Sequence, residues 1–164
     1  MAVTGQSYEP DADLTALVDH PQNPRDGKTD VVAKSIDANG LYGAIIAHAD
    51  TGYILAGHTR RRALVDTGTT HGPVIWLDCD DKTATRILLA DNRTAELAAW
   101  DESALLSLLR GMGEAEFAGA GFTTFDLEAL ARSVDDFEPT ITDERDDITS
   151  REITCPECGH TWEP

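Results

Sequence analysis

The chain has 164 residues, enough for one domain and a short appendage. It carries 30 acidic against 13 basic side chains, a formal net charge of −17, and a uniformly acidic surface repels phosphate backbones, which excludes non-specific DNA binding by the whole surface. No apolar run is long enough for a transmembrane helix, and the first residues lack the basic start and apolar middle of a signal peptide, so we expect a cytoplasmic protein with no membrane contact.

The chain alternates helix and strand signals with clear turn residues between them. Residues 1–13 are polar, and we expect a frayed terminus there. Two prolines fix an extended loop over 20–25, Thr29 or Asp30 can begin a helix that Gly40 ends, and the turn at 50–52 predicts a hairpin. We expect strands over 44–49, 53–56 and 73–78, and helices over 60–65, from 80 or 81 to about 91, from 101 to Gly111, and from Thr124 onward.

The C-terminal part differs in composition from the rest. Residues 135–152 are acidic and poor in large apolar groups, which is typical of a linker. We therefore predict a flexible N-terminus over 1–13, one domain over 14–133, an acidic linker over 134–152 and a zinc-knuckle-like tail over 153–164.

The segment from Gly57 to Ala63 (GHTRRRA) has the residues of a phosphate site, because it follows a predicted strand and begins a helix. A glycine lets the backbone approach a ligand, the first helical N–H groups point outward, and guanidinium groups match phosphate oxygens in pairs. The alternative is structural: three consecutive arginines point about 100° apart, so some of them face solvent or pair with acids.

Several motifs in order make this chain resemble the N-terminal domain of ParB proteins, in the ParB/sulfiredoxin superfamily. The resemblance covers about residues 14–100 and is carried by 20–25 (HPQNPR), Ser35-Ile36, Gly40-Leu41, 52–63, Pro73-Val74-Ile75, Asp80-Asp81 and 90–93 (ADNR). It implies an α/β (α+β) fold, a small mixed sheet with flanking helices.

The resemblance also implies a nucleotide site, with CTP or ATP and Mg²⁺ as ligands. The resemblance implies phosphate contacts from Gly57, Arg60 and Arg62, and Asp91 and Asn92 match its second phosphate motif. His58, Thr59 and Arg93 complete the candidate nucleotide- and phosphate-binding set, with Arg93 out of register with the family's arginine. This chain departs from the family at two positions. His58 stands where the family has a glutamate that is tied to nucleotide hydrolysis, and Gly43 stands near the position of a family proline in the segment that recognises the base. His58 and Asp91 are the candidate catalytic residues, and whether the chain is an enzyme stays open.

The stretch 90–101 (ADNRTAELAAWD) is similar to ParB-like proteins of phages and mobile elements that accompany DNA methyltransferases, often labelled ParB-like nucleases. This subgroup implies a nucleotide-binding module in DNA metabolism or modification, with a methyltransferase as a possible partner and DNA reached through a partner or a local arginine patch. Two alternatives remain: an enzyme of the same fold, either a nuclease or an NTP-dependent phosphotransferase, and an acidic protein-interaction module without a ligand.

The tail contains a C-x₂-C turn at Cys155 and Cys158, a spacing that lets two thiolates reach one tetrahedral Zn²⁺. His160 is a candidate third ligand. A closed site needs four ligands, so three possibilities stay open: a second subunit completes the site in a homodimer, a remote histidine completes it, or no metal binds.

Overall fold

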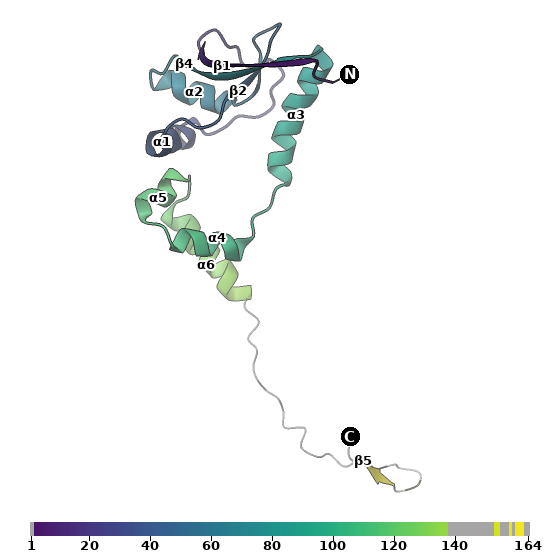
Figure 1. The fold of residues 1–164 in the computed structure, drawn as a ribbon. Helices are drawn as coiled ribbons and strands as arrows, with labels where there is room; N and C mark the ends of the chain where they lie inside the picture. Colours follow the sequence, from purple (N-terminus) through teal and green to yellow (C-terminus); the bar gives the residue numbers. More distant parts are fainter. Residues whose placement is uncertain (1, 138–152, 155–157, 159, 163–164) are drawn as a thin grey trace.

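The computed structural model describes residues 2–137, 153–154, 158 and 160–162 (Figure 1). The strands are β1 (Gly5–Asp13), β2 (Ile45–His48), β3 (Ile54–Ala56), β4 (His71–Asp78), β5 (Ile153–Thr154) and β6 (Thr161–Trp162). The helices are α1 (Thr29–Asn39), α2 (His58–Asp66), α3 (Asp81–Leu97), α4 (Glu102–Arg110), α5 (Glu114–Gly119) and α6 (Thr124–Phe137).

The first four strands form one mixed sheet in the order β1-β4-β2-β3. The hairpin predicted around residues 50–52 is present, because β2 and β3 pair antiparallel. Strand β4 pairs in parallel with β2 and antiparallel with β1. The small mixed sheet with flanking helices that the sequence predicts is therefore confirmed.

The first strand corrects the expectation of a frayed terminus. Residues Gly5–Asp13 run antiparallel to β4, from the pair of Gly5 with Asp78 to the pair of Asp13 with His71. The sequence pattern did not predict this strand because it is an edge strand with mostly exposed polar side chains. Its proline, Pro10, lies where the register shifts between Glu9 and Ala12, and an irregular edge position tolerates a proline.

Helices cover both faces of the sheet. On one face, Leu64 of α2 and Ile36 of α1 pack with Ile45, Ala47 and Val74 of the strands. On the other, Ala84 and Ile87 of α3 pack with Leu55, Leu77, Ile46 and Ile75. The alternation along β2 and β4 thus splits their apolar side chains between two cores, as the two-residue repeat of a strand requires.

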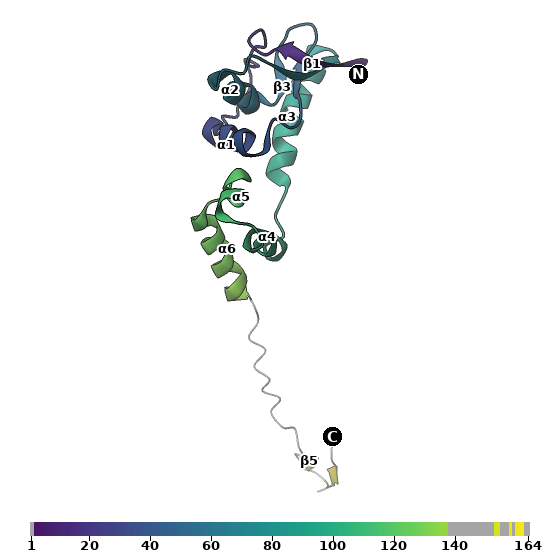
Figure 2. The same cartoon turned by 60° about the vertical axis from the view of Figure 1, so that its left-hand side comes forward.

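Helix α3 leads away from the sheet to a unit of three helices, α4–α6, which we call the helical unit (Figures 1 and 2). The expected end of α3 near Asp91 is wrong by six residues, since no glycine or proline interrupts it before Leu97. The short helix α5 was not predicted. It rests against α1, where the Asn39 side-chain amide donates to the Gly119 carbonyl at 3.0 Å.

Helix α6 begins one residue earlier than a Thr124 cap implies. The Thr123 hydroxyl accepts from the Asp126 N–H at 3.2 Å, and the Asp126 carboxylate accepts from the Thr123 N–H at 2.8 Å. Thr123 is therefore the cap and Thr124 lies inside the helix. None of the helices in the described residues is long and apolar enough to cross a membrane.

The tail brings two short strands together, with Ile153 opposite Trp162. Cys155 and the acidic linker of residues 138–152 lie outside the described residues, so only Cys158 and His160 of the candidate zinc ligands are described. Among the described residues, no three His, Cys, Asp or Glu side chains are grouped as a metal would require. The zinc knuckle remains a prediction.

Candidate nucleotide site

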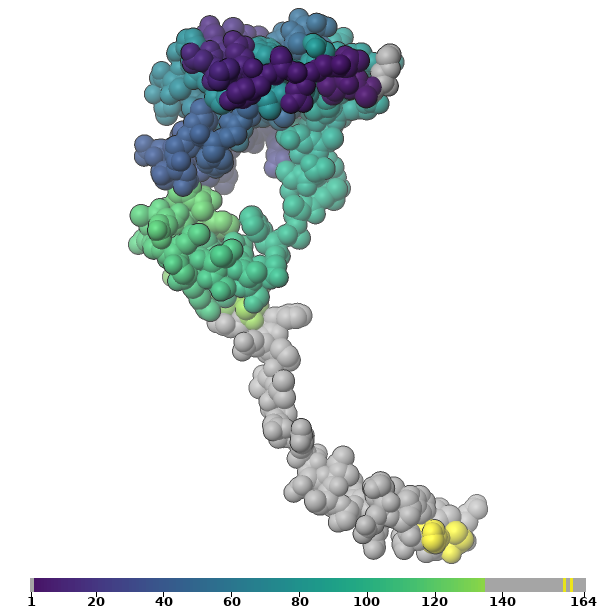
Figure 3. All heavy atoms as spheres, in the orientation of Figure 1, coloured from purple at the N-terminus to yellow at the C-terminus, as the bar shows by residue number. Residues whose placement is uncertain are grey.

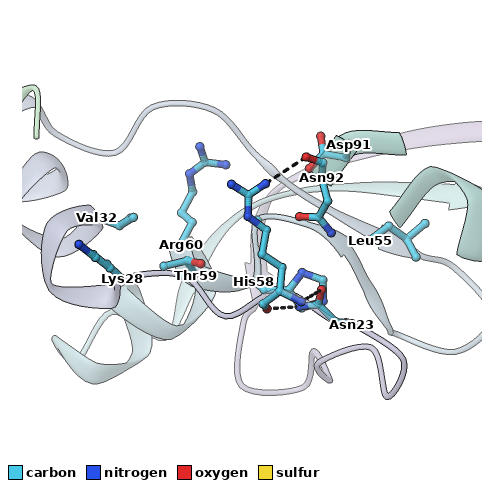
Figure 4. Close-up of a pocket in the computed structure, with 12 residues that line it drawn as sticks. Asn23, Lys28, Val32, Leu55, His58, Thr59, Arg60, Asp91 and Asn92 are labelled. Carbon is cyan, nitrogen blue, oxygen red and sulfur yellow. Dashed lines mark hydrogen bonds between the residues drawn. The ribbon is translucent and has the colours of Figure 1, made fainter. Parts of the chain in front are cut away.

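A pocket of 290 Å³ lies at the first turn of α2, between the loop before α1 and the C-terminal half of α3 (Figure 4). Its lining is mixed in charge and rich in hydrogen-bonding groups. The lining residues are Asn23, Arg25, Gly27, Lys28, Val32, Leu55, Gly57, His58, Thr59, Arg60, Asp91 and Asn92.

The N-terminus of α2 is open toward this pocket. Gly57 precedes the helix with φ 93° and ψ 21°, a left-handed conformation that favours glycine, and a Cβ there would lie 3.5 Å from the Cα of Ile45. The first intrahelical bond is donated by the Arg61 N–H to the Gly57 carbonyl at 2.9 Å. The N–H groups of residues 58–60 therefore have no acceptor one turn earlier, and no side chain caps them.

The start of α2 differs from the starts of α3 and α4, which lie away from the pocket. In α3 and α4 an aspartate before the helix accepts a backbone N–H, Asp80 from Thr83 at 2.7 Å and Asp101 from Ala104 at 2.9 Å. No side chain caps α1, whose preceding residues Gly27 and Lys28 line the pocket. Two uncapped helix starts thus border one pocket, and each favours an anion.

The loop before α1 can approach α2 closely because Gly27 has no side chain. A Cβ on Gly27 would collide with the Thr59 hydroxyl, so only glycine allows this approach. The loop is also braced internally, because the Asn23 side-chain amide donates to the Arg25 carbonyl at 3.0 Å and its oxygen accepts the Arg25 N–H at 3.2 Å. These contacts bring Arg25 and Lys28 beside the helix start.

The three consecutive arginines of α2 have three different sets of partners. Arg60 lines the pocket and donates to the Ala44 carbonyl at 3.0 Å. Arg61 donates to the carbonyls of Leu14 and Leu17, each at 3.1 Å. Arg62 pairs with Asp19 at 3.1 Å and Asp26 at 2.7 Å, and the Asp26 carboxylate above all holds the pKa of its guanidinium above the ordinary value.

The pocket is locally cationic in an acidic protein. Arg25, Lys28 and Arg60 line it, and Asp91 supplies the one carboxylate among its described lining residues. Arg25 also reaches across to α3, where its guanidinium donates to the Asn92 carbonyl at 3.1 Å. A chain with a net charge of −17 therefore gathers three cations around two open helix starts, which is the arrangement that an anionic ligand needs.

His58 is the most enclosed polar side chain of the pocket, with 8% of its surface exposed. Its Nε2 atom accepts the His20 N–H at 3.4 Å, so the proton of the neutral ring lies on Nδ1. Burial lowers the pKa of His58, with the Asp19 carboxylate opposing that effect. The ring is therefore neutral at neutral pH.

This burial predicts a pH dependence of stability. The lowered folded pKa means that the unfolded chain binds the proton more tightly, so the stability from neutral His58 is present above about pH 6.5 and is lost as the pH falls toward the folded pKa. Acidification from about pH 7.5 to about pH 5.5 should lower the melting temperature of the wild type more than that of His58→Gln. Parallel melting curves for the two proteins across this range would contradict the assignment.

The structure brings together most, but not all, of the residues predicted for the site. Gly57, His58, Thr59, Arg60, Asp91 and Asn92 line the pocket. Arg62 does not line it and is engaged by its two aspartates, and Arg93 pairs with Glu96 at 3.1 Å outside it. Sequence reasoning missed Asn23, Arg25, Gly27, Lys28, Val32 and Leu55, of which the first two lie in the HPQNPR motif that it quoted.

No protein-family model matches the chain, and no curated protein matches it. Solved structures do. The C-terminally truncated chromosome-partitioning protein ParB from Caulobacter crescentus, complexed with CTP-gamma-S, matches with a TM-score of 0.59 and 19% identity over 80% of this chain and 79% of that one.

Two structures of a Pnob8-like ParB N-domain match more weakly, with TM-scores of 0.47 and 0.45 and identities of 12% and 14%. Each match covers 98% of this chain, which spans 58% and 55% of those chains. The Caulobacter match and the order of motifs agree, and the chain has a ParB-like fold.

Proposed function

We propose that this protein binds a nucleoside triphosphate in the pocket at the start of α2, with the phosphates against the N–H groups of residues 58–60. The observation that carries the proposal is the convergence of Arg25, Lys28 and Arg60 on that open helix start. Helix dipole, unpaired N–H groups and guanidinium forks act on the same anion here. CTP is the first ligand to test, because the Caulobacter ParB of the same fold is complexed with CTP-gamma-S.

There is room for the rest of the nucleotide beside the phosphates. A second pocket of 220 Å³ adjoins the first and shares Val32 and Arg60 with it. Val31, Ile36 and Tyr42 give it apolar walls, and the Tyr42 hydroxyl lies 3.0 Å from the Ser35 hydroxyl. In this proposal the base enters that pocket while Arg60 lies between base and phosphates.

Mg²⁺ is the metal that this ligand would bring, because magnesium is usually held by one or two carboxylates together with substrate phosphates. Asp91 is the carboxylate that lines the pocket. His58 accepts a backbone N–H on Nε2, which leaves its Nδ1–H as a donor rather than a base. We therefore propose binding as the main activity, with Asp91 as the candidate base if a phosphate-release assay detects hydrolysis.

For the wider role, we propose a nucleotide-binding module in DNA metabolism. The net charge of −17 disfavours direct contact with a phosphate backbone outside the cationic pocket, so DNA would be reached through a partner. The phage setting and the methyltransferase partner stay predictions from the sequence.

Lys28 offers a test with a matched control. Lys28 directly precedes α1 and lines the pocket, whereas Lys34 lies further along the same helix, is also exposed and does not line the pocket. Both Lys28→Ala and Lys34→Ala remove one positive charge. We expect Lys28→Ala to weaken the binding of Mg-CTP about tenfold in calorimetric titrations, because one charge-assisted contact to phosphate is lost.

The control should change affinity less than about twofold at physiological salt, where distant charges are screened. Equal losses for the two lysine variants would mean that general electrostatics, and not the pocket, binds the nucleotide. Binding of no nucleoside triphosphate by the wild type would refute the proposed function and leave an interaction module without a ligand.

A further inference from the structure

The helical unit carries an apolar groove that the nucleotide site does not use. The groove lies between α4 and α6, has a volume of 280 Å³ and is lined by Leu105, Phe122, Ala129, Leu130, Glu102, Asp126 and Ser133. We propose that it binds a basic amphipathic helix of a partner protein.

The apolar surface extends beyond the groove itself. Trp100 stacks edge-on against Phe122 with ring centroids 6.1 Å apart, yet 71% of its surface is exposed. Leu108 follows Leu105 by three residues on α4, and Phe125 precedes Ala129 by four on α6, so each continues the face of the helix that lines the groove. Both are also largely exposed, at 63% and 70%. Large exposed apolar patches with aromatic members are typical of protein interfaces.

The acidic charge around this surface favours a partner with basic side chains. Acidic side chains outnumber basic ones in residues 98–134, where the acids are Asp101, Glu102, Glu114, Glu116, Asp126 and Glu128 and the bases are Arg110 and Arg132. Two of the acids, Glu102 and Asp126, line the groove. The Thr123 hydroxyl and N–H hold the pKa of Asp126 below its ordinary value, which keeps it ionised.

Charge also disfavours the other occupants. A second copy of the chain brings another net charge of −17, and residues 138–164 are acidic in sequence as well. Duplex DNA is repelled for the same reason. A groove between two helices with an acidic rim accepts an apolar helix face flanked by lysine or arginine, the helix-in-groove mode of recognition. The helical unit that carries the groove lies on the far side of α1 and α3 from the sheet (Figure 3).

The test uses a synthetic amphipathic helix of leucine and lysine, about 18 residues or five turns long, titrated into the whole protein at physiological salt with fluorescence anisotropy as the readout. A scrambled peptide of the same composition controls for charge alone. We expect the amphipathic peptide to bind and the scrambled peptide to bind at least about tenfold more weakly.

Two matched variants locate the binding. Glu102→Lys and Glu128→Lys change the net charge equally, but only Glu102 lines the groove, so we expect Glu102→Lys to weaken binding about tenfold relative to Glu128→Lys. Ala129→Phe fills the groove without a charge change and should weaken binding as well; melting curves verify that each variant is folded.

Equal effects of the two charge reversals, or unchanged binding by a folded Ala129→Phe, would overturn the proposal. So would concentration-dependent self-association through this face, or binding of duplex DNA to it in place of the peptide.

Discussion

Arg60→Ala should reduce the affinity for Mg-CTP about a hundredfold, or about 2.7 kcal/mol, because hydrogen bonds to charged groups contribute about 1.5–3 kcal/mol and the guanidinium would make such bonds to phosphate. Arg60 is the one arginine of α2 that lines the pocket, and it borders both the phosphate pocket and the adjoining apolar pocket. Its guanidinium is already oriented by the Ala44 carbonyl at 3.0 Å, so little order has to be gained on binding.

Two companion variants sharpen this result. Arg60→Lys keeps the positive charge but loses the planar guanidinium that can donate two hydrogen bonds to one phosphate, so its affinity should fall between those of the wild type and Arg60→Ala. Arg132→Ala removes an exposed arginine of α6 and should leave affinity unchanged. Calorimetric titration of all four proteins measures the effect, and an Arg60→Ala affinity within about twofold of the wild type would exclude Arg60 from the site.

Arg61→Ala should instead destabilise the fold by about 3 kcal/mol, while folded protein keeps its affinity for nucleotide. The Arg61 guanidinium donates to two backbone carbonyls, of Leu14 and Leu17, whose side chains are fully buried. A hydrogen bond to a charged group contributes about 1.5–3 kcal/mol, and losing it leaves the carbonyl without its partner. For a chain of this length the melting temperature should fall by about 6–12 °C.

The neighbouring arginine supplies the control. Arg62 forms ion pairs with Asp19 and Asp26 that are partly exposed to solvent, and pairs of this kind contribute about 0–1 kcal/mol. Arg62→Ala should therefore cost less than about 1 kcal/mol in urea unfolding. Equal losses of stability for Arg61→Ala and Arg62→Ala would mean that the hydrogen bonds from Arg61 to the Leu14 and Leu17 carbonyls do not stabilise the fold.

The different roles of these three arginines could not be assigned from the sequence. Local signals were sufficient for two features: Gly57 predicted the start of α2, and the turn at 50–52 predicted the hairpin of β2 and β3. Which arginine faces the pocket depends on where Leu14, Leu17 and Asp19 lie. These partners of Arg61 and Arg62 are more than 40 residues away from them in the sequence, so only the tertiary structure brings them together.

Strand β1 and the pocket residues Arg25 and Lys28 were missed for the same reason, because they depend on tertiary contacts. Strand β1 pairs with β4, which lies far along the chain, and its exposed polar side chains and Pro10 hide the two-residue alternation that identifies a strand. Arg25 and Lys28 reach the site because Gly27 lets their loop pack on Thr59, a tertiary contact without a local pattern. The motifs predicted the fold and the glycine turn before α2, and tertiary contacts supplied the rest of the pocket.

The central claim is that a nucleotide's phosphates lie against the first turn of α2, and a two-dimensional ¹⁵N NMR titration with Mg-CTP tests it most directly. The amide signals of His58, Thr59 and Arg60 should show the largest shifts, because their N–H groups would donate to phosphate oxygens. The Lys34 and Arg132 amides, outside the pocket, should move little. Saturable binding that shifts other amides and leaves residues 58–60 unchanged would contradict the account.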